Sequence, residues 1–336
     1  MKTPTNDFAR SLTAFLGQYL PGQRNASRHT VAAYRDTFKL FLRYCESVHQ
    51  IRPDRLRLKR LTHDLVLGFL DWLEAERHNT IATRNQRLAA FRAYCLYVQP
   101  EIPEHLDEWQ RILAIPSKKK PRPLIPFLTT DEMRILLQQP PPGTRDQVLL
   151  ATLYDTGARV QELLELTPQS IRLDAPAVVT LQGKGQKSRH VPLMPNTRQL
   201  LSDYLKTARP TPGYADPPIF LNQYRTALTR RGVSYLVDKY VQQARSVPGF
   251  LAQGRITPHV FRHSRAIHML QAGINLVYIR DFLGHATVVS TEIYARADTE
   301  MKRKALERVD YGLEVSKMPA WERDGELMAW LEDLCR

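Results

Sequence analysis

The chain has 336 residues, of which 43% are hydrophobic, so it can build two domain cores and is not disordered over most of its length. No run of about 18 uncharged apolar residues occurs, so no membrane span is predicted, and three scattered cysteines exclude a disulfide framework and a four-cysteine zinc site. The formal net charge of +14 favours a polyanionic partner such as nucleic acid.

The first hundred residues have the spacing of helices. Residues 6–20 form an amphipathic stretch that ends at the helix-stopping pair Pro21-Gly22. Three further helices, each with apolar residues three and four positions apart, are predicted to begin at Ser27, Thr62 and Thr80. The pattern predicts a small helical domain over residues 1–114.

Residues 115–126 interrupt this pattern, since four prolines and four basic residues fall within twelve positions. Such a density of proline predicts an extended, semi-rigid segment, and we interpret residues 115–127 as a linker between two domains. The linker is either a solvated tether or a basic strap along a phosphate backbone. We favour the strap, whose DNA-contacting side chains would be Lys118, Lys119, Lys120 and Arg122.

A second domain is predicted over residues 128–300. It begins with a helix at Thr129, whose first turn is acidic. A further helix covers residues 145–154 and ends near Gly157. Arg159 then opens an apolar helical run, where a rigidly held guanidinium near free amide groups suits an oxyanion, although an isolated arginine there is more often a surface residue.

Two short strands are predicted at residues 178–182 and 188–193, joined by the turn Gly183-Lys-Gly-Gln-Lys187. The glycines let the backbone bend sharply and leave the Lys184 ammonium clear of neighbouring side chains. Taken alone, such a turn is more often a solubilising surface feature. The predicted fold class is mainly α with a small antiparallel β-sheet.

The segment ITPHVFRHSRA begins a helix at Pro258 and places His259 and Arg262 on one helix face. His263 lies four residues after His259, which makes a metal pair an alternative. No Asp or Glu lies between Pro258 and His268 to complete such a site. We therefore predict no metal and expect His263 and His268 to pack or to hydrogen-bond structurally.

Five features occur in a fixed order: an arginine after T-G-A, a lysine in a Gly-rich turn, the HVFRH motif, LGH with His285, and Tyr294 nine residues on. In this order they resemble the tyrosine recombinase (phage integrase) family, and the chain is similar to chromosome-dimer-resolving and transposon-encoded integrases. The first domain resembles the SAM-like core-binding domain of that family. The resemblance implies a two-domain DNA clamp made of a helical core-binding domain and a catalytic domain.

The resemblance also assigns roles to individual residues. Arg159 and Arg262 would clamp the phosphate, and Lys184 would be the hairpin lysine. The two histidines and the nucleophile of the family would be His259, His285 and Tyr294. Glu162 stands where the family often has an acidic residue, and it would orient Arg159.

The chemistry that this set implies is a transesterification without metal, cofactor or ATP. Two guanidiniums can bind the nonbridging oxygens of a phosphodiester and stabilise the extra charge of the transition state. We expect nearby arginines to lower the pKa of Tyr294, His259 to handle its proton, and Lys184 to protonate the departing 5′ oxygen. His285 would hydrogen-bond the scissile phosphate. The products would be a 3′-phosphotyrosine and a free 5′ hydroxyl.

Double-stranded DNA is the predicted partner of both domains. Residues 1–120 carry 20 basic and 12 acidic side chains, and residues 121–297 carry 21 and 12. Charge of this kind gives affinity rather than sequence choice. Beyond the linker, the predicted DNA-contacting side chains are Arg84, Asn85, Arg87, Lys187 and Arg230.

The tail over residues 301–336 is rich in apolar side chains, Trp330 and Leu331 among them. It either folds back on its own domain or docks on a neighbouring subunit, as the C-terminal helix commonly does in the family. We favour exchange between subunits. The resemblance then implies a homo-tetramer on two DNA sites that passes through a Holliday junction, with accessory recombination proteins as further candidate partners.

The N-terminus, MKTPTNDFAR, lacks the apolar segment of a secretory signal. We therefore expect a cytoplasmic, nucleoid-associated enzyme of mobile-element DNA. Three alternatives are a type IB topoisomerase, which shares the chemistry, a non-catalytic DNA-binding regulator and a metal-dependent nuclease. The tyrosine with its arginines argues against a pure binder, the exchangeable tail argues against a topoisomerase, and EDTA would distinguish the nuclease.

Overall fold

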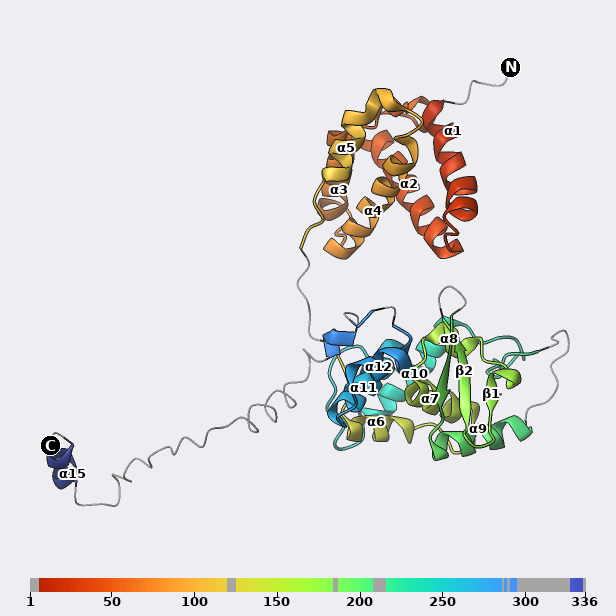
Figure 1. Cartoon of the computed structure of the whole chain (residues 1–336), viewed down its shortest axis with the longest axis vertical. Helices are drawn as coiled ribbons and strands as arrows, with labels where there is room; N and C mark the ends of the chain where they lie inside the picture. The colour runs from red at the N-terminus through yellow and green to blue at the C-terminus, as the bar shows by residue number, and fades with distance from the viewer. Residues whose placement is uncertain are drawn as a thin grey trace. The chain divides into compact units, whose positions relative to one another are not determined.

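The computed structural model describes residues 6–119, 125–183, 187–207, 216–285, 287, 288, 291–294 and 327–334, and it divides into two compact units, Met1–Pro123 and Leu124–Arg336 (Figure 1). Among the described residues, no helix is long and apolar enough to cross a membrane. Each unit has its own hydrophobic core, as the sequence predicts.

The first unit is helical. Its elements are α1 (Asp7–Ala14), the π-helix η1 (Phe15–Gln23), α2 (Arg28–His49), α3 (His63–Ala75), α4 (Ile81–Val98), α5 (Leu106–Ala114) and the 3₁₀ turns η2 (Pro53–Arg55), η3 (Leu58–Arg60) and η4 (Pro103–His105). The predicted helix starts are confirmed, because the hydroxyls of Ser27, Thr62 and Thr80 each cap a helix by accepting a first-turn amide hydrogen. The core is aromatic: the ring of Phe38 contacts those of Phe91 and Tyr94, and the ring of Phe41 contacts that of Phe91.

The end predicted for the first helix is wrong by three residues. Pro21 lies inside η1, which continues to Gln23. The wider π-helical turn tolerates a residue without an amide hydrogen, because its hydrogen bonds are already displaced from the i→i−4 pattern.

Residues 115–119, the described part of the proline-rich segment's first half, pack on the first unit. Ile115 is buried in the core, and Arg92 donates to its carbonyl oxygen. Asn85 on α4 exchanges two hydrogen bonds with the Lys118 backbone, at 2.8 and 3.1 Å. The two units divide between Pro123 and Leu124, inside the segment predicted as linker.

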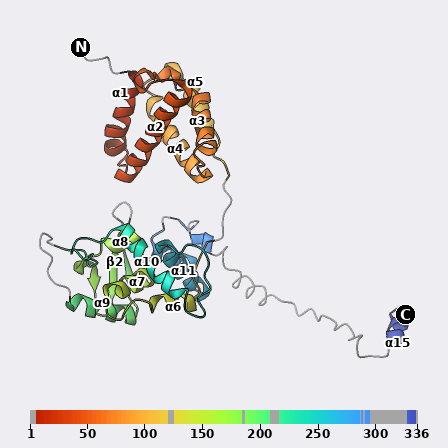
Figure 2. The same ribbon diagram turned by 180° about the vertical axis from the view of Figure 1, so that it is seen from behind.

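The second unit combines helices with a small sheet at one side of the unit (Figure 2). Its helices are α6 (Thr130–Leu137), α7 (Arg145–Thr156), α8 (Val160–Leu164), α9 (Pro195–Thr207), α10 (Arg230–Ala244), α11 (Pro258–Gln271), α12 (Leu276–Leu283), the 3₁₀ turn η5 (Pro168–Ser170) and, near the C-terminus, α15 (Leu327–Asp333). Thr129 caps α6 through a capping box with Glu132. Gly157 ends α7 in the left-handed conformation, with φ of 57°.

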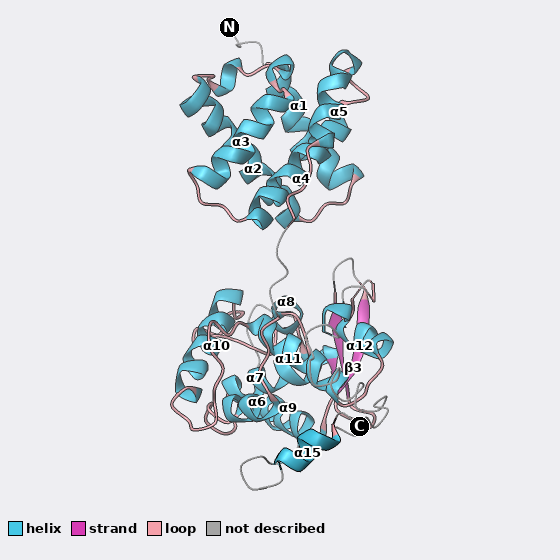
Figure 3. Ribbon diagram, turned by 90° about the vertical axis from the view of Figure 1, so that its left-hand side faces the viewer, coloured by secondary structure: helices cyan, strands magenta, loops and turns pink. Residues whose placement is uncertain are grey.

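The sheet is antiparallel in the order β1-β2-β3 and lies at one edge of the unit, with α12 next to β3 (Figure 3). Its strands are β1 (Ile171–Arg172), β2 (Val178–Gln182) and β3 (Ser188–Pro192). Thus β2 has its predicted bounds and β3 is one residue shorter than predicted. The sequence analysis missed β1, because two residues are too few to show an alternating pattern.

Candidate active site

The C-terminal end of α12 gathers three guanidiniums. Gly284 ends this helix with φ of 65°, which leaves carbonyl oxygens without helical partners at the negative end of the helix dipole. Three arginines from different elements bind three consecutive carbonyl oxygens: Arg189 that of Phe282 at 2.9 Å, Arg262 that of Leu283 at 2.6 Å, and Arg159 that of Gly284 at 3.5 Å. A helix end thus attracts a cluster of positive charge.

Arg262 is the most deeply held of the three. It projects from α11, is 3% exposed and also donates to the carbonyl oxygen of Gly157 at 2.8 Å. Burial and the charges of the neighbouring arginines lower its pKa to about 10, so it stays protonated at neutral pH. A larger residue at position 157 would disturb both contacts of Arg262. A Cβ there would lie 3.0 Å from a methyl group of Leu283, the residue whose carbonyl oxygen Arg262 also binds.

Arg159 and Glu162 form the first turn of α8. The Glu162 carboxylate accepts from the Arg159 amide at 2.8 Å and from its guanidinium at 2.7 Å. This is the contact expected of a residue that orients Arg159, whose side chain is 38% exposed. Its catalytic importance stays a prediction.

Arg189 on β3 is a site residue that the sequence analysis missed. It binds both oxygens of the 4% exposed Glu162 carboxylate, at 3.0 and 2.7 Å, and is itself 11% exposed. Burial alone would raise the pKa of Glu162, but the hydrogen bonds from Arg189 and Arg159 and the charge of Arg189 outweigh it and lower this pKa. The alternation of the strand could have indicated Arg189 as a site residue, because residues two apart share a strand face and Val191 is buried.

Tyr294 is 1% exposed and packs against α11 and α12 in its own unit. Its hydroxyl lies 3.0 Å from Nδ1 of His263, and its ring is nearly parallel to that of His285, with centroids 6.2 Å apart. The expectation of a lowered Tyr294 pKa is wrong. Burial raises this pKa more than the positive charges of Arg262 and Arg159 lower it.

The histidines occupy distinct positions. His259 is exposed, and its ring centroid lies 6.2 Å from that of His263. His285 shares a 3.0 Å hydrogen bond with the Thr291 hydroxyl, and burial with nearby arginine charge lowers its pKa to about 4. His268 has a structural role as predicted, since its ring nitrogens lie 2.8 Å from the Tyr154 hydroxyl and 2.9 Å from the Leu128 carbonyl oxygen. His263 was expected to pack or to hydrogen-bond structurally, and the partner of its Nδ1 is the hydroxyl of the predicted nucleophile.

Lys184 lies outside the described residues, as do Lys120 and Arg122. The stem of its hairpin is described: the Gly183 amide donates to the Lys187 carbonyl oxygen at 2.8 Å. A Cβ built on Gly183 would lie 3.7 Å from a Glu162 carboxylate oxygen, so the stem leaves the sheet next to the arginine cluster. In the described parts of the chain, no three His, Cys, Asp or Glu side chains are grouped as metal ligands would be.

The predicted DNA-contacting residues of the first unit have internal partners. Arg84 is 2% exposed and donates to the Pro116 carbonyl oxygen, so its predicted contact with DNA is wrong, because a buried guanidinium has no surface to offer. Arg87 donates to the carbonyl oxygen of Ala33 and to the hydroxyl of Thr37. The Lys118 ammonium pairs with Glu74 at 2.6 Å, whereas Lys119 is exposed.

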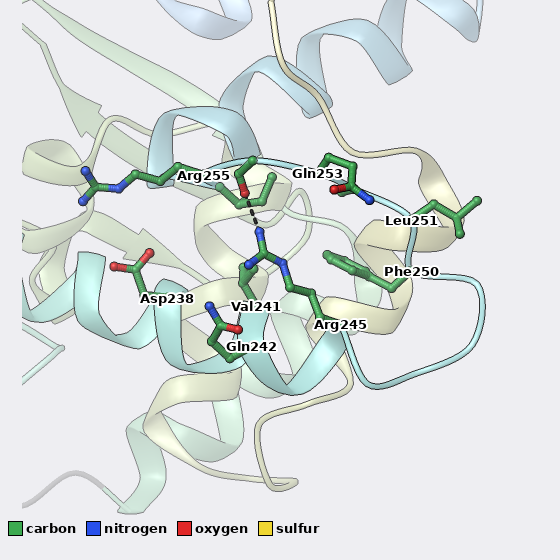
Figure 4. A pocket seen from close by; sticks show the side chains of 11 residues that line it. Asp238, Val241, Gln242, Arg245, Phe250, Leu251, Gln253 and Arg255 are labelled. Atoms are coloured by element: carbon green, nitrogen blue, oxygen red, sulfur yellow. Dashed lines mark hydrogen bonds between the residues drawn. The ribbon is translucent and has the colours of Figure 1, made fainter.

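In the second unit, Lys187 and Arg230 are exposed. The Arg230 guanidinium donates to Gln161 on α8 at 2.7 Å, which places it near Arg159. A cavity of about 610 Å³ between α10 and residues 250–256 is lined by Arg245, Phe250 and their neighbours (Figure 4). It contains none of the residues predicted to react, so the candidate chemistry belongs to the arginine cluster and Tyr294.

Residues 126–301 match the phage integrase family, and residues 12–99 match the N-terminal SAM-like domain of phage integrases. A Sinorhizobium fredii protein that carries the name integrase/recombinase y4rC is 35% identical over 96% of this chain and 97% of its own. Tyrosine recombinase XerC of Roseiflexus castenholzii is 32% identical over 85% of this chain and 88% of its own. The structure of XerH site-specific recombinase bound to palindromic difH substrate is similar in fold, with a TM-score of 0.68 at 22% identity over 88% of this chain and 84% of that one.

Proposed function

The chain belongs to the phage integrase family and is a site-specific tyrosine recombinase, and from this premise we propose that Tyr294 is the nucleophile that cleaves its DNA. The observation that carries the proposal is the position of the Tyr294 hydroxyl, buried in the same unit as Arg159 and Arg262 and under the influence of both charges. Attack on phosphorus forms a 3′-phosphotyrosine and breaks the bond to the 5′ oxygen. The energy of the phosphodiester is retained in the new ester, so no ATP is required.

The scissile phosphate is bound by Arg159 and Arg262. Arg262 spends one N–H of each terminal nitrogen on a carbonyl oxygen, and each nitrogen carries a second N–H that can bind a nonbridging oxygen. Arg159 is partly exposed and can turn toward the DNA. Together they stabilise the charge that develops on the phosphoryl oxygens in the transition state.

Lys184 is the general acid in this proposal. It would give a proton to the 5′ oxygen as the P–O bond breaks, and the position of the hairpin stem beside Glu162 supports this role. His285 would bind a phosphate oxygen, since the charges of Arg262 and Arg159 act on it. His259, which the sequence analysis expected to handle the Tyr294 proton, is exposed and under the same charges, so in this proposal it binds the phosphate as well.

Double-stranded DNA is the substrate in this proposal, bound by basic residues of both units. The side chains that remain candidates for its phosphates are Lys118, Lys119, Lys120, Arg122, Arg87, Lys187 and Arg230. Strand exchange follows when a 5′ hydroxyl from a second duplex attacks the phosphotyrosine, which requires two sites and passes through a Holliday junction. Four protomers would assemble on these sites, in the cytoplasm and on mobile-element DNA. The tail over residues 301–336 would dock on a neighbour, although of this tail only residues 327–334 belong to the described residues.

The nucleophile is tested with sites selected by covalent capture from duplexes that carry a randomised central segment. Wild-type protein should form an SDS-resistant protein–DNA adduct in the presence of EDTA, and Tyr294→Phe should form none. Tyr278→Phe is the matched control, because Tyr278 is an exposed tyrosine of α12. An adduct that persists in Tyr294→Phe would refute the assignment.

The general acid is tested with a sulfur atom in place of the bridging 5′ oxygen. A thiolate leaves without a proton, so this substrate should restore cleavage to Lys184→Ala but not to Arg262→Ala. Failure of the sulfur substrate to rescue Lys184→Ala would exclude Lys184 as the proton donor.

A further inference from the structure

The Tyr294 hydroxyl has a histidine partner that the site assignment above does not use. Nδ1 of His263 lies 3.0 Å from this hydroxyl, and the two ring centroids are 5.6 Å apart. His263 follows Arg262 directly on α11, so the helix that holds the phosphate-binding guanidinium also holds this imidazole. Two groups needed at one phosphorus atom would thus share one rigid element.

The other histidines of the site are arranged differently. Among the described residues, no hydrogen bond joins His259 or His285 to the Tyr294 hydroxyl; His259 faces solvent, and Nδ1 of His285 is engaged with Thr291. Proton transfer requires a base within hydrogen-bond distance of the proton that it removes. His263 meets that requirement.

We propose that His263 is the general base that removes the Tyr294 proton during cleavage, an inference that rests on the proposed role of Tyr294 as nucleophile. As the phenol oxygen forms its bond to phosphorus, its proton passes to Nδ1 of His263 and the bond from phosphorus to the 5′ oxygen breaks. That oxygen receives a proton from the general acid. In rejoining, the imidazolium returns its proton to the departing phenol oxygen, so no proton is consumed over the cycle.

The surroundings of His263 keep it ready to accept. Burial, with the charges of His259 and Arg262 on the same helix, lowers its pKa to about 4, so the ring is neutral at pH 7 and its Nδ1 lone pair is free for the hydroxyl. The other groups near this pair are His285 and Arg159, and the cation of Arg159 acts on Tyr294 itself. A bound phosphodiester cancels arginine charge next to the ring and thereby raises the affinity of His263 for the proton.

The test uses His263→Asn, since an asparagine oxygen can occupy the position of Nδ1 and accept the same hydrogen bond but cannot take the proton. Single-turnover cleavage of a captured site is measured from pH 3.5 to pH 9, so that the range includes the acidic inflection expected from the His263 pKa of about 4. We expect a loss of about 10²- to 10⁴-fold at pH 7, unchanged affinity for the DNA, and a rate that rises with pH without the acidic inflection of the wild type. His268→Asn is the matched control, because it makes the same replacement at another half-buried histidine of α11 whose Nδ1 contacts a tyrosine hydroxyl, and it should keep the wild-type profile.

Wild-type rate within threefold, or retention of the acidic inflection in folded His263→Asn, overturns the proposal. If that variant does not fold, His263→Ala is assayed with added imidazole, which should accelerate cleavage in proportion to its concentration; a folded His263→Ala that imidazole does not accelerate also overturns it. Tyr294→Phe is run in parallel. An adduct in Tyr294→Phe refutes the nucleophile itself, whereas its absence together with an unaffected His263→Asn refutes only the base.

Discussion

Both units hold arginines against backbone carbonyl oxygens, but with different consequences. On α4 of the first unit, Arg84, Arg87 and Arg92 each bind a carbonyl from another segment. In the second unit the guanidiniums of Arg159, Arg189 and Arg262 converge on one helix end. The separate contacts of the first unit fasten a chain segment. The three converging guanidiniums of the second unit share one carboxylate, that of Glu162, so net positive charge remains, and Arg262 and Arg159 act on the Tyr294 hydroxyl.

Among the arginine and lysine substitutions that compare the two units, the largest effect should come from Arg262→Lys. Lysine keeps the charge but cannot span the Gly157 and Leu283 carbonyl oxygens, so the transition state loses its positioned donors, and cleavage should fall by about 10³-fold. Single-turnover cleavage with DNA affinity measured in parallel checks this. Arg265→Lys on the same helix, where Arg265 pairs with Asp155, should lose less than tenfold, and equal losses in the two variants would contradict the account.

A smaller effect on chemistry and a clear effect on stability are expected for Arg189→Met. The Glu162 carboxylate would keep Arg159 but lose its bidentate partner, which should lower the free energy of unfolding by about 3 kcal/mol and cleavage by about tenfold. Arg84→Met is the counterpart in the first unit. It should destabilise the protein without slowing cleavage by the folded enzyme. Urea titration measures the stability, and single-turnover assays measure the cleavage. A loss of cleavage equal to that of Arg189→Met would contradict the contrast between the two units.

Acid should destabilise the second unit within a defined pH range. Because the folded-state pKa values of His263 and His285 are lowered to about 4 from 6.5, the unfolded chain binds more protons between these values. Their contribution to stability is therefore complete above pH 6.5 and is lost as the pH falls toward 4. His285→Asn should make the stability of the second unit depend less on pH, which hydrogen exchange with mass spectrometry can measure. An unchanged dependence on pH would show that the His285 pKa is not its cause.

The smallest effect concerns the basic segment. Lys119 is exposed, so Lys119→Ala should weaken DNA binding a few-fold and reduce the salt dependence of log K by about 0.9. Lys118 pairs with Glu74, so Lys118→Ala should change the salt dependence less. Titrations by fluorescence anisotropy at several salt concentrations compare the two variants, and a larger change for Lys118→Ala would show that the ion pair opens on DNA.

Much of the fold is readable from local chemistry. Ser27, Thr62, Thr80 and Thr129 cap helices because side-chain oxygens satisfy first-turn amides, an interaction within four residues of sequence. The strands around the Lys184 turn follow from alternation. Pro21 misled because a π-helical turn depends on packing that local sequence does not encode, and β1 was too short to leave a pattern.

Only those site residues that belong to a sequence motif of the family could be predicted from the sequence. The resemblance supplied Arg159, Arg262 and Tyr294, but not the carbonyl oxygens of α12 that hold the arginines. Arg189 was missed and His263 was given only a structural role, since their partners Glu162 and Tyr294 lie 27 and 31 residues away. Arg84 was misplaced for the converse reason, because a basic helix position looks alike whether it faces DNA or a carbonyl oxygen.

The most direct measurement maps the protein–DNA adduct to a residue. Trypsin cuts after Arg280 and Arg296, so Tyr294 is the one tyrosine of the peptide covering residues 281–296. After nuclease digestion, mass spectrometry should find a nucleotide remnant on Tyr294 in this peptide. A remnant on any other residue, with Tyr294 unmodified, would contradict the account.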